Sequence, residues 1–298
     1  MRRFIGPLAA FFLLWVPVMA GQSQPESKTT AMSGPPKVLQ IFREEVKPGK
    51  GAEHEKVEAG WPRAFSKANW PTHYLAMTSL TGAPEAWFVT GYSSLGAWEK
   101  DGDAMDKTAT LKAETDRLAE QDGQLLSGAR GLVAVYRPEM SYRATINVAT
   151  MRYFRVVTFA VRPGHTEEFV ESRKLAKAAH EKANVDDHYA VFEVVAGAPL
   201  GTYLLLVPMK SLGELDEFDQ LHGTAYKEAM GREGEKKMNE LSSAAVLRVD
   251  STIFAFSPKM SYVSQEWVAA NPDFWAPKTA VAKAAPANKG VQKAVKKQ

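Results

Sequence analysis

The six histidines are the residues of this chain best suited to acid–base chemistry, because imidazole titrates near neutral pH. Two of them, His73 and His188, each precede a tyrosine and lie 115 positions apart. Their equivalent places favour a shared task, and we predict them to be a catalytic pair of proton-transfer groups. The alternative is a structural role, in which each ring makes one hydrogen bond to the turn before a strand.

A second group of polar residues is predicted to line a ligand pocket. His54 and His180 occupy expected helical positions where the sequence 115 positions away has a phenylalanine. Each is either a polar group on the wall of a helix–sheet pocket or a partly buried side chain with one hydrogen bond. The strand that holds Arg43 also holds two glutamates, and its alternation should turn some of these side chains inward. The remaining predicted pocket residues are Arg155, Tyr74 and Tyr189.

Other kinds of site have no recognisable signal. The chain has no cysteine, which excludes disulfides, thiolate metal sites and cysteine nucleophiles. Metal spacings such as HExxH, nucleophile elbows, phosphate loops and dinucleotide fingerprints are also missing from the sequence. We therefore predict no metal site from the sequence.

Five short motifs occur twice in the same order, which indicates an internal duplication. The second occurrence follows the first by 115 to 120 positions. The motifs start at 46 and 161 (Val-Lys/Arg-Pro-Gly), 73 and 188 (His-Tyr), 82 and 197 (Gly-Ala-Pro), 94 and 211 (Ser-Leu-Gly), and 140 and 260 (Met-Ser-Tyr). The sequence thus predicts one domain used twice, over 37–143 and 153–262, with a linker at 144–152.

Each predicted repeat has the order strand, helix, strand, strand, helix, strand, which is the ferredoxin-like unit. β-branched and aromatic residues predict strands over 38–46, 73–80, 86–92, 132–136, 153–161, 188–196, 202–207 and 246–256. Glycines should break the second helical stretches near 102, 223 and 231–234. A sheet with helices on one face needs cover on the other. We therefore expect an α+β fold in which two β-α-β-β-α-β repeats pack sheet to sheet as an intrachain pseudo-dimeric barrel.

The two ends of the chain differ from its body. Residues 1–20 combine two arginines, a short apolar run and small residues before a cleavage point, as in a signal peptide. An uncleaved anchor is the alternative. Residues 21–36 read as a disordered linker, and 263–298 as a mostly disordered tail rich in alanine, lysine and proline. Trp267 to Trp275 in this tail are predicted to form an aromatic clasp. A periplasmic or secreted location follows.

The basic charge sits in these ends. The formal net charge is +3, with +2 in residues 1–20 and +6 in residues 274–298, which leaves the body at −5. A nucleic-acid-binding domain would carry its positive charge on the folded surface, so nucleic acid is excluded as a partner. The lysine-rich tail is expected either to solubilise the protein or to contact an anionic envelope surface.

The strand–Val-Lys-Pro-Gly–helix opening and the Ser-Leu-Gly before the second helix resemble the dimeric α+β barrel superfamily. That superfamily includes antibiotic-biosynthesis-type monooxygenases and NIPSNAP-like proteins, and the resemblance covers 37–262. The tandem form most resembles secreted members of unknown role. The resemblance implies cofactor-free or haem-dependent enzymes as well as proteins without chemistry. In haem-degrading members the axial histidine comes from the region that here holds His222, so haem, if bound, would use His222.

The sequence predicts an exported barrel, a monomer or homodimer without stable membrane insertion, that binds a small apolar or aromatic ligand and needs no cofactor. The ligand is expected in the barrel or in a helix–sheet pocket. The alternative is a cofactor-free or haem-dependent monooxygenase-like enzyme. Whether the protein is an enzyme stays open, because no complete catalytic constellation is visible in the sequence.

Overall fold

The computed structural model describes residues 34–217 and 223–276. The predicted signal peptide, most of the predicted linker, the lysine-rich end of the tail and His222 lie outside the described residues. Among the described helices, none has the length and apolar character needed to cross a membrane.

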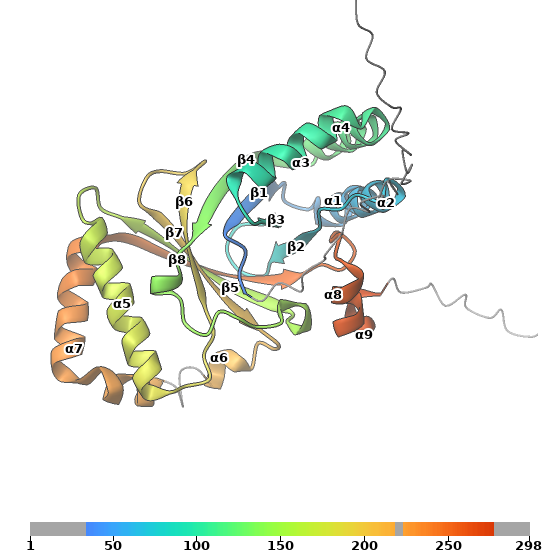
Figure 1. Ribbon diagram of the computed structural model, residues 1–298. Coiled ribbons are helices and arrows are strands. Elements are labelled where there is room, and N and C mark those ends of the chain that lie inside the picture. Colours follow the sequence, from blue (N-terminus) through green and yellow to red (C-terminus); the bar gives the residue numbers. More distant parts are fainter. Residues whose placement is uncertain (1–33, 218–222, 277–298) are drawn as a thin grey trace, which may run out of the picture. The chain divides into compact units, whose positions relative to one another are not determined.

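The first half of the fold runs from β1 to β4 (Figure 1). Its elements are β1 (Val38–Val46), α1 (Gly51–Glu58), α2 (Gly60–Lys67), β2 (Tyr74–Ser79), β3 (Glu85–Tyr92), α3 (Leu95–Lys107), α4 (Ala109–Gly123) and β4 (Leu126–Tyr136). The strands match the predicted ones, except that β4 begins six residues earlier. The break expected near Gly102 lies at Thr108 instead, whose backbone leaves the helical region with φ −99° and ψ 74°.

The second half runs from β5 to β8 and ends in two short helices. Its elements are β5 (Tyr153–Val161), α5 (Thr166–Ala183), β6 (Ala190–Ala196), β7 (Thr202–Met209), α6 (Glu214–Glu217), α7 (Gly223–Ala245), β8 (Val246–Phe256), α8 (Gln265–Ala270) and α9 (Pro272–Trp275). Short 3₁₀ turns at Pro138–Met140 and Val148–Thr150 lie between the halves. Helix α7 is kinked at Gly231, where φ is 68°, within the region predicted to break.

The eight strands form one closed antiparallel barrel in the order β1-β3-β2-β8-β5-β7-β6-β4. The predicted α+β barrel is therefore confirmed. Its two sets of four strands do not form separate sheets, because hydrogen bonds join them edge to edge. One seam pairs Met77–Ser79 of β2 with Phe254–Phe256 of β8, and the other pairs β4 with β6. Closure removes free edges along these segments.

The repeated Met-Ser-Tyr motif locks these seams. Tyr262 exchanges backbone hydrogen bonds with Tyr74, and Tyr142 does the same with Tyr189. The Ser261 hydroxyl accepts the Ala76 N–H at 2.9 Å. In the other seam Ser141 accepts the N–H of Val191, also at 2.9 Å. Each motif thus completes the sheet of the opposite half, which explains why it follows the last strand of each half.

Alternation along the strands separates an inner core from an outer one. In β5, Phe154 and Val156 belong to the inner cluster, whereas Phe159 and Val161 pack outward with Phe169 of α5. Figure 1 shows α5 beside α7, which pack together, while α1 and α2 contact α4. The inner cluster is filled by large side chains that include Trp87, Phe192, Phe254 and Phe256.

The predicted aromatic clasp is also observed. Trp275 of α9 is buried, its Nε1–H donates to the Ala149 carbonyl at 2.7 Å, and its ring contacts Phe256. Trp267 packs edge-on against Trp275, with ring centroids 5.4 Å apart. The folded chain therefore extends to residue 276, beyond the predicted domain boundary at 262.

Candidate functional site

Four ionisable side chains meet between the first half of the barrel wall and its helices. Glu44 comes from β1, His54 and Glu58 come from α1, and Asp122 comes from the last turn of α4. We call these four residues the buried centre. Each is at most 5% exposed, and one ligand atom from each lies within 4.8 Å of the others. Four ionisable groups buried together are uncommon, because burial penalises charge.

The strand alternation places Glu44 in this layer. Leu39 and Ile41 point into the barrel, so Glu44 points outward to the helices. Its neighbours across the sheet are Ala86 on β3 and Ala129 on β4. Because these neighbours are small, the Glu44 carboxylate and helix α1 have room on the outer face of the strand.

Helical spacing and one close contact bring in the other three residues. His54 and Glu58 are four residues apart and therefore share a face of α1. Asp122 follows Leu118 by one turn on α4. Gly60 at the start of α2 lets α4 approach, because a Cβ there would lie 2.4 Å from a methyl carbon of Leu118. The approach of α4 sets the position of Asp122.

One imidazole nitrogen faces two carboxylates. His54 Nε2 lies 2.8 Å from Glu44 Oε2 and 3.5 Å from Asp122 Oδ1. A single N–H can make only one good hydrogen bond here, and the shorter distance assigns it to Glu44. Asp122 Oδ1 consequently has no hydrogen-bond partner among the described residues.

The mutual proximity of the carboxyl groups changes their protonation. Burial, followed by the charges of Glu44 and Asp122, raises the pKa of Glu58 to about 9, with the Trp61 indole N–H acting in the opposite direction. Burial and Glu44 raise the pKa of Asp122 to about 6, while His54 counteracts the rise. Glu58 is thus protonated at neutral pH in the protein alone.

Buried polar atoms without partners concentrate around this centre. Among the described residues they include Glu58 Oε1, Asp122 Oδ1 and the Tyr74 hydroxyl. Burial first, and then the charges of Glu58 and Glu44, raise the pKa of Tyr74. Unsatisfied buried groups are costly, so their concentration in one place calls for an explanation.

A depression at the barrel rim reaches the buried centre. It has a volume of about 450 Å³ and is lined by His54, the ends of β1, β2 and β8, and the turn before β3. The exposed residues Lys47 and Lys259 stand at its edge. We call this feature the rim depression. It gives the buried centre a neighbouring space that a small molecule can enter.

The predicted catalytic pair is placed at two separate turns. His73 stacks on Tyr262 with ring centroids 4.7 Å apart, and burial lowers its pKa. The Nδ1 of His188 lies 2.8 Å from the Arg143 carbonyl, and its Nε2 lies 3.2 Å from Asp186. Both rings have the turn contacts of the structural alternative. No described contact joins the two histidines.

Of the predicted pocket histidines, His54 belongs to the buried centre and His180 does not. His180 Nδ1 hydrogen-bonds the Ala176 carbonyl at 2.8 Å, and its Nε2 lies 3.5 Å from Asp187. Its ring packs against Tyr189 and Tyr226. His180 therefore sits in the helix–sheet layer of the second half.

The two predicted pocket arginines lie on opposite faces of the barrel wall. Arg43 pairs with Glu85 at 2.9 Å and stacks over Trp87, whose indole N–H also donates to Glu85. Arg155 lies on the outward face of β5, where its Nε donates to the Ser251 hydroxyl. Of the two arginines, only Arg43 is near the rim depression, because its partner Glu85 lines that depression.

Sequence reasoning missed Glu58 and Asp122. The spacing of His54 and Glu58 was a usable signal, because two ligand-type residues four apart share a helix face. Asp122 had no such signal in the sequence, because a charged residue near a helix end usually faces solvent. Its place depends on the contact between Gly60 and Leu118.

The second half fills the corresponding place differently. The seventh residue of β5 is Phe159, and the fourth and eighth residues of α5 are Phe169 and Arg173. The two rings pack with centroids 5.3 Å apart, and the Arg173 guanidinium lies over both. A packing of aromatic rings and a guanidinium is therefore compatible with this fold, and the carboxyl groups of the first half are not required by it.

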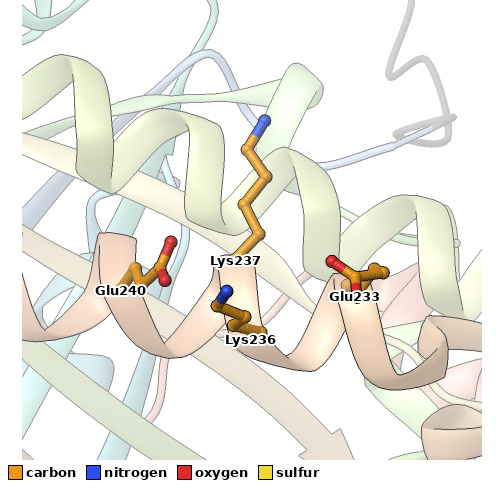
Figure 2. Close-up of a pocket in the computed structure, with 5 residues that line it drawn as sticks. Glu233, Lys236, Lys237 and Glu240 are labelled. Atoms are coloured by element: carbon orange, nitrogen blue, oxygen red, sulfur yellow. The ribbon is translucent and has the colours of Figure 1, made fainter.

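A second depression lies along α7 and has none of these features. Figure 2 shows its side chains, Glu233, Lys236, Lys237 and Glu240, all of them exposed. Lys237 pairs with Glu171 of α5. Alternating exposed charges of this kind form a solvated helix face, so the buried centre and rim depression are the better candidate site.

Comparison with family models and with curated protein sequences found no match. Solved structures resemble the chain in fold. A candidate monooxygenase from Fusobacterium nucleatum is 11% identical, with a TM-score of 0.47, over 74% of this chain and 93% of that one. An anthrone oxidase-like protein is 11% identical, with a TM-score of 0.47, over 74% and 92%. A chlorite dismutase from Candidatus Nitrospira defluvii, in complex with imidazole, is 10% identical, with a TM-score of 0.43, over 75% and 92%. Likeness at this level carries no conclusion about activity.

Proposed function

We propose that this protein binds a small polar molecule in the rim depression and that the buried centre acts on it. The observation that carries the proposal is that His54, hydrogen-bonded to buried Glu44, also lines the rim depression. Perturbed ionisable groups beside a concave space are typical of reactive sites.

Polar side chains in the lining favour a small polar ligand over the apolar or aromatic ligand expected from the sequence. Thr78 and Ser257, which carry hydroxyl groups, line the rim depression. Lys47 donates to the Gln124 carbonyl and has no carboxylate partner among the described residues. Large apolar side chains fill the barrel interior itself, which favours the rim as the place for a ligand.

Enzyme activity is the reading that this geometry favours. A monooxygenase-like enzyme, cofactor-free or haem-dependent, remains our proposal for its class from the resemblance. For the haem variant the test is an absorbance titration with haem. A Soret shift that is lost in His222→Ala supports it, and the lack of a shift rejects it.

The architecture and location complete the proposal. We infer that the halves are duplicated ferredoxin-like repeats, since each has the strand order β4-β1-β3-β2 or its equivalent and the Met-Ser-Tyr motifs make matching contacts. We further propose export through residues 1–20. The lysine-rich tail would then meet an anionic envelope surface, and the barrel would be a monomer or homodimer.

The function is tested by ligand-induced stabilisation. Thermal denaturation of the full chain is measured with and without a panel of small carboxylates and phosphates, together with mass spectrometry of molecules that co-purify from the native source. We expect at least one compound to raise the Tm of the wild type and to lose this effect in Thr78→Val and Ser257→Ala. Ser66→Ala, an exposed serine on α2, is the matched control. Equal shifts in all variants would reject the rim depression as the site.

A further inference from the structure

We propose that Glu44, His54, Glu58 and Asp122 bind one divalent transition-metal ion, of the class of Zn²⁺, Mn²⁺ or Fe²⁺. Their ligand atoms all lie within 4.8 Å of one another. In a tetrahedral site with bonds of about 2.0–2.2 Å, the ligand atoms lie about 3.3–3.6 Å apart. Side-chain shifts of about 1 Å would therefore close the site around a metal ion.

Unsatisfied oxygens point to the ligand independently of the clustering. Glu58 and Asp122 are each 3% exposed, and each has a buried carboxyl oxygen without a hydrogen-bond partner among the described residues. Asp122 Oδ1 lies 3.5 Å from His54 Nε2, which already serves Glu44 at 2.8 Å, and a carboxyl oxygen of Glu58 belongs to the same cluster. A divalent cation there would satisfy both oxygens at once and would offset two of the three negative charges that the carboxylates carry when ionised.

The fold alone does not explain these residues. At the corresponding positions of β5 and α5, Phe159, Phe169 and Arg173 form a stacked aromatic and guanidinium cluster. A strand and helix of the same kind thus pack together without any carboxylate. The first half has carboxyl groups and an imidazole, which can bind a metal ion, at the positions where the second half has packed side chains.

The donor set selects the class of ion. One imidazole nitrogen with three carboxylates suits Zn²⁺, Mn²⁺ and Fe²⁺, which accept both nitrogen and oxygen ligands. Ca²⁺ takes six to eight oxygen ligands, and Mg²⁺ keeps several waters, so neither fits a closed set of four with one nitrogen. We expect millimolar Mg²⁺ or Ca²⁺ not to displace the bound ion.

This inference rests on the buried centre of the proposed function and gives that centre a metal-dependent role. Because His54 belongs to the buried centre and also lines the rim depression, an ion held by it would lie next to a bound small molecule. The metal can bind in the absence of any small molecule. The metal titration and the rim-ligand test can therefore fail separately.

The test is calorimetric titration of chelator-treated full-length protein with ZnCl₂ and MnCl₂, and absorbance titration with CoCl₂. We expect one equivalent to bind. Glu58→Gln and Asp122→Asn should each weaken binding by about 100-fold or more, since even residues behind the ligands commonly cost 10–100-fold. Glu53→Gln, an exposed carboxylate on the same helix, is the matched control and should bind as the wild type does.

Two results would overturn the inference. One is that none of the three ions binds to the wild type. The other is binding of equal strength in Glu58→Gln, Asp122→Asn and Glu53→Gln, which would place the ion elsewhere. If a variant fails to fold, the wild type still decides the case, because a bound ion must raise its Tm in proportion to the logarithm of metal concentration at saturation. An unchanged Tm would reject the site.

Discussion

His54 Nε2 lies 2.8 Å from Glu44 Oε2, which ties helix α1 to strand β1 by a buried hydrogen bond. Removing either partner leaves the other buried without its hydrogen bond. We expect Glu44→Leu or His54→Leu to lower the free energy of unfolding by about 3 kcal/mol in chelator. Urea denaturation followed by circular dichroism measures the loss. The double variant should lose less than the sum of the single losses, and strict additivity would contradict the coupling.

The protonated state of Glu58 makes the stability of the metal-free protein fall as pH rises. The pKa of Glu58 is raised from 4.5 to about 9 in the folded state. Above pH 4.5 the folded state therefore holds one proton more than the unfolded state, and this stability is lost as pH rises toward 9. Between about pH 7 and pH 8.5 we expect a slope of about 1.4 kcal/mol per pH unit from this group.

Glu58→Gln tests this slope, because glutamine keeps the shape and the neutral state of the protonated acid. Denaturation of both proteins across this pH range, in chelator, should show the variant becoming the more stable one as pH rises. Glu53→Gln should follow the wild type. Parallel profiles for wild type and Glu58→Gln would show that Glu58 is not protonated in the folded protein.

Gly60→Ala is expected to act on the buried centre from a distance. The added Cβ would lie 2.4 Å from a methyl carbon of Leu118, so this buried side chain or α4 itself must shift, although neither residue belongs to the buried centre. We expect a loss of stability of about 1–3 kcal/mol, typical of overpacking, and weaker metal binding through the displaced Asp122. Calorimetry of the variant with ZnCl₂ measures the second effect. Gly102→Ala in α3, where a Cβ meets open space, should leave metal binding unchanged and should raise stability by about 0.5–1 kcal/mol through helix propensity.

The aromatic clasp contributes to the stability of the barrel. Trp275 is 4% exposed and hydrogen-bonds Ala149, whereas Trp98 on α3 is 37% exposed. Trp275→Ala should lower the free energy of unfolding by about 3–5 kcal/mol. Trp98→Ala should change it by about 0.5 kcal/mol or less. Similar effects of the two substitutions in chemical denaturation would mean that α9 is not docked in solution.

Much of the fold could be predicted from the sequence, because the residue pattern within each strand and turn indicates that element. The β-branched runs of β1 and β5 and the Pro-Gly turns that follow them need only neighbouring residues. The seams could not be predicted in detail, since Ser261 and Ala76 are 185 positions apart and meet only in the closed barrel. Residue type alone would place Trp98 in the core, yet α3 has no buried residue and Trp98 is 37% exposed.

The site was less visible in the sequence. His54 was singled out because it replaces an aromatic residue on a helix, and the structure places it in the buried centre. Its partners Glu44 and Glu58 look like residues of a strand end and of a solvated helix face. The burial of these side chains depends on how α4 packs on α1 and α2. A local sequence pattern does not predict this tertiary packing.

The crossed seams also determine when this protein can fold. β2 lies in the first third of the chain, but its edge is completed by β8 and by Ser261. A chain emerging from a ribosome or a translocation channel cannot close the barrel until nearly all of residues 34–262 are available. Contacts of such long range slow folding. A growing chain therefore exposes the open edge of β2 throughout its synthesis, and a truncation before residue 254 leaves that edge free to pair with another molecule.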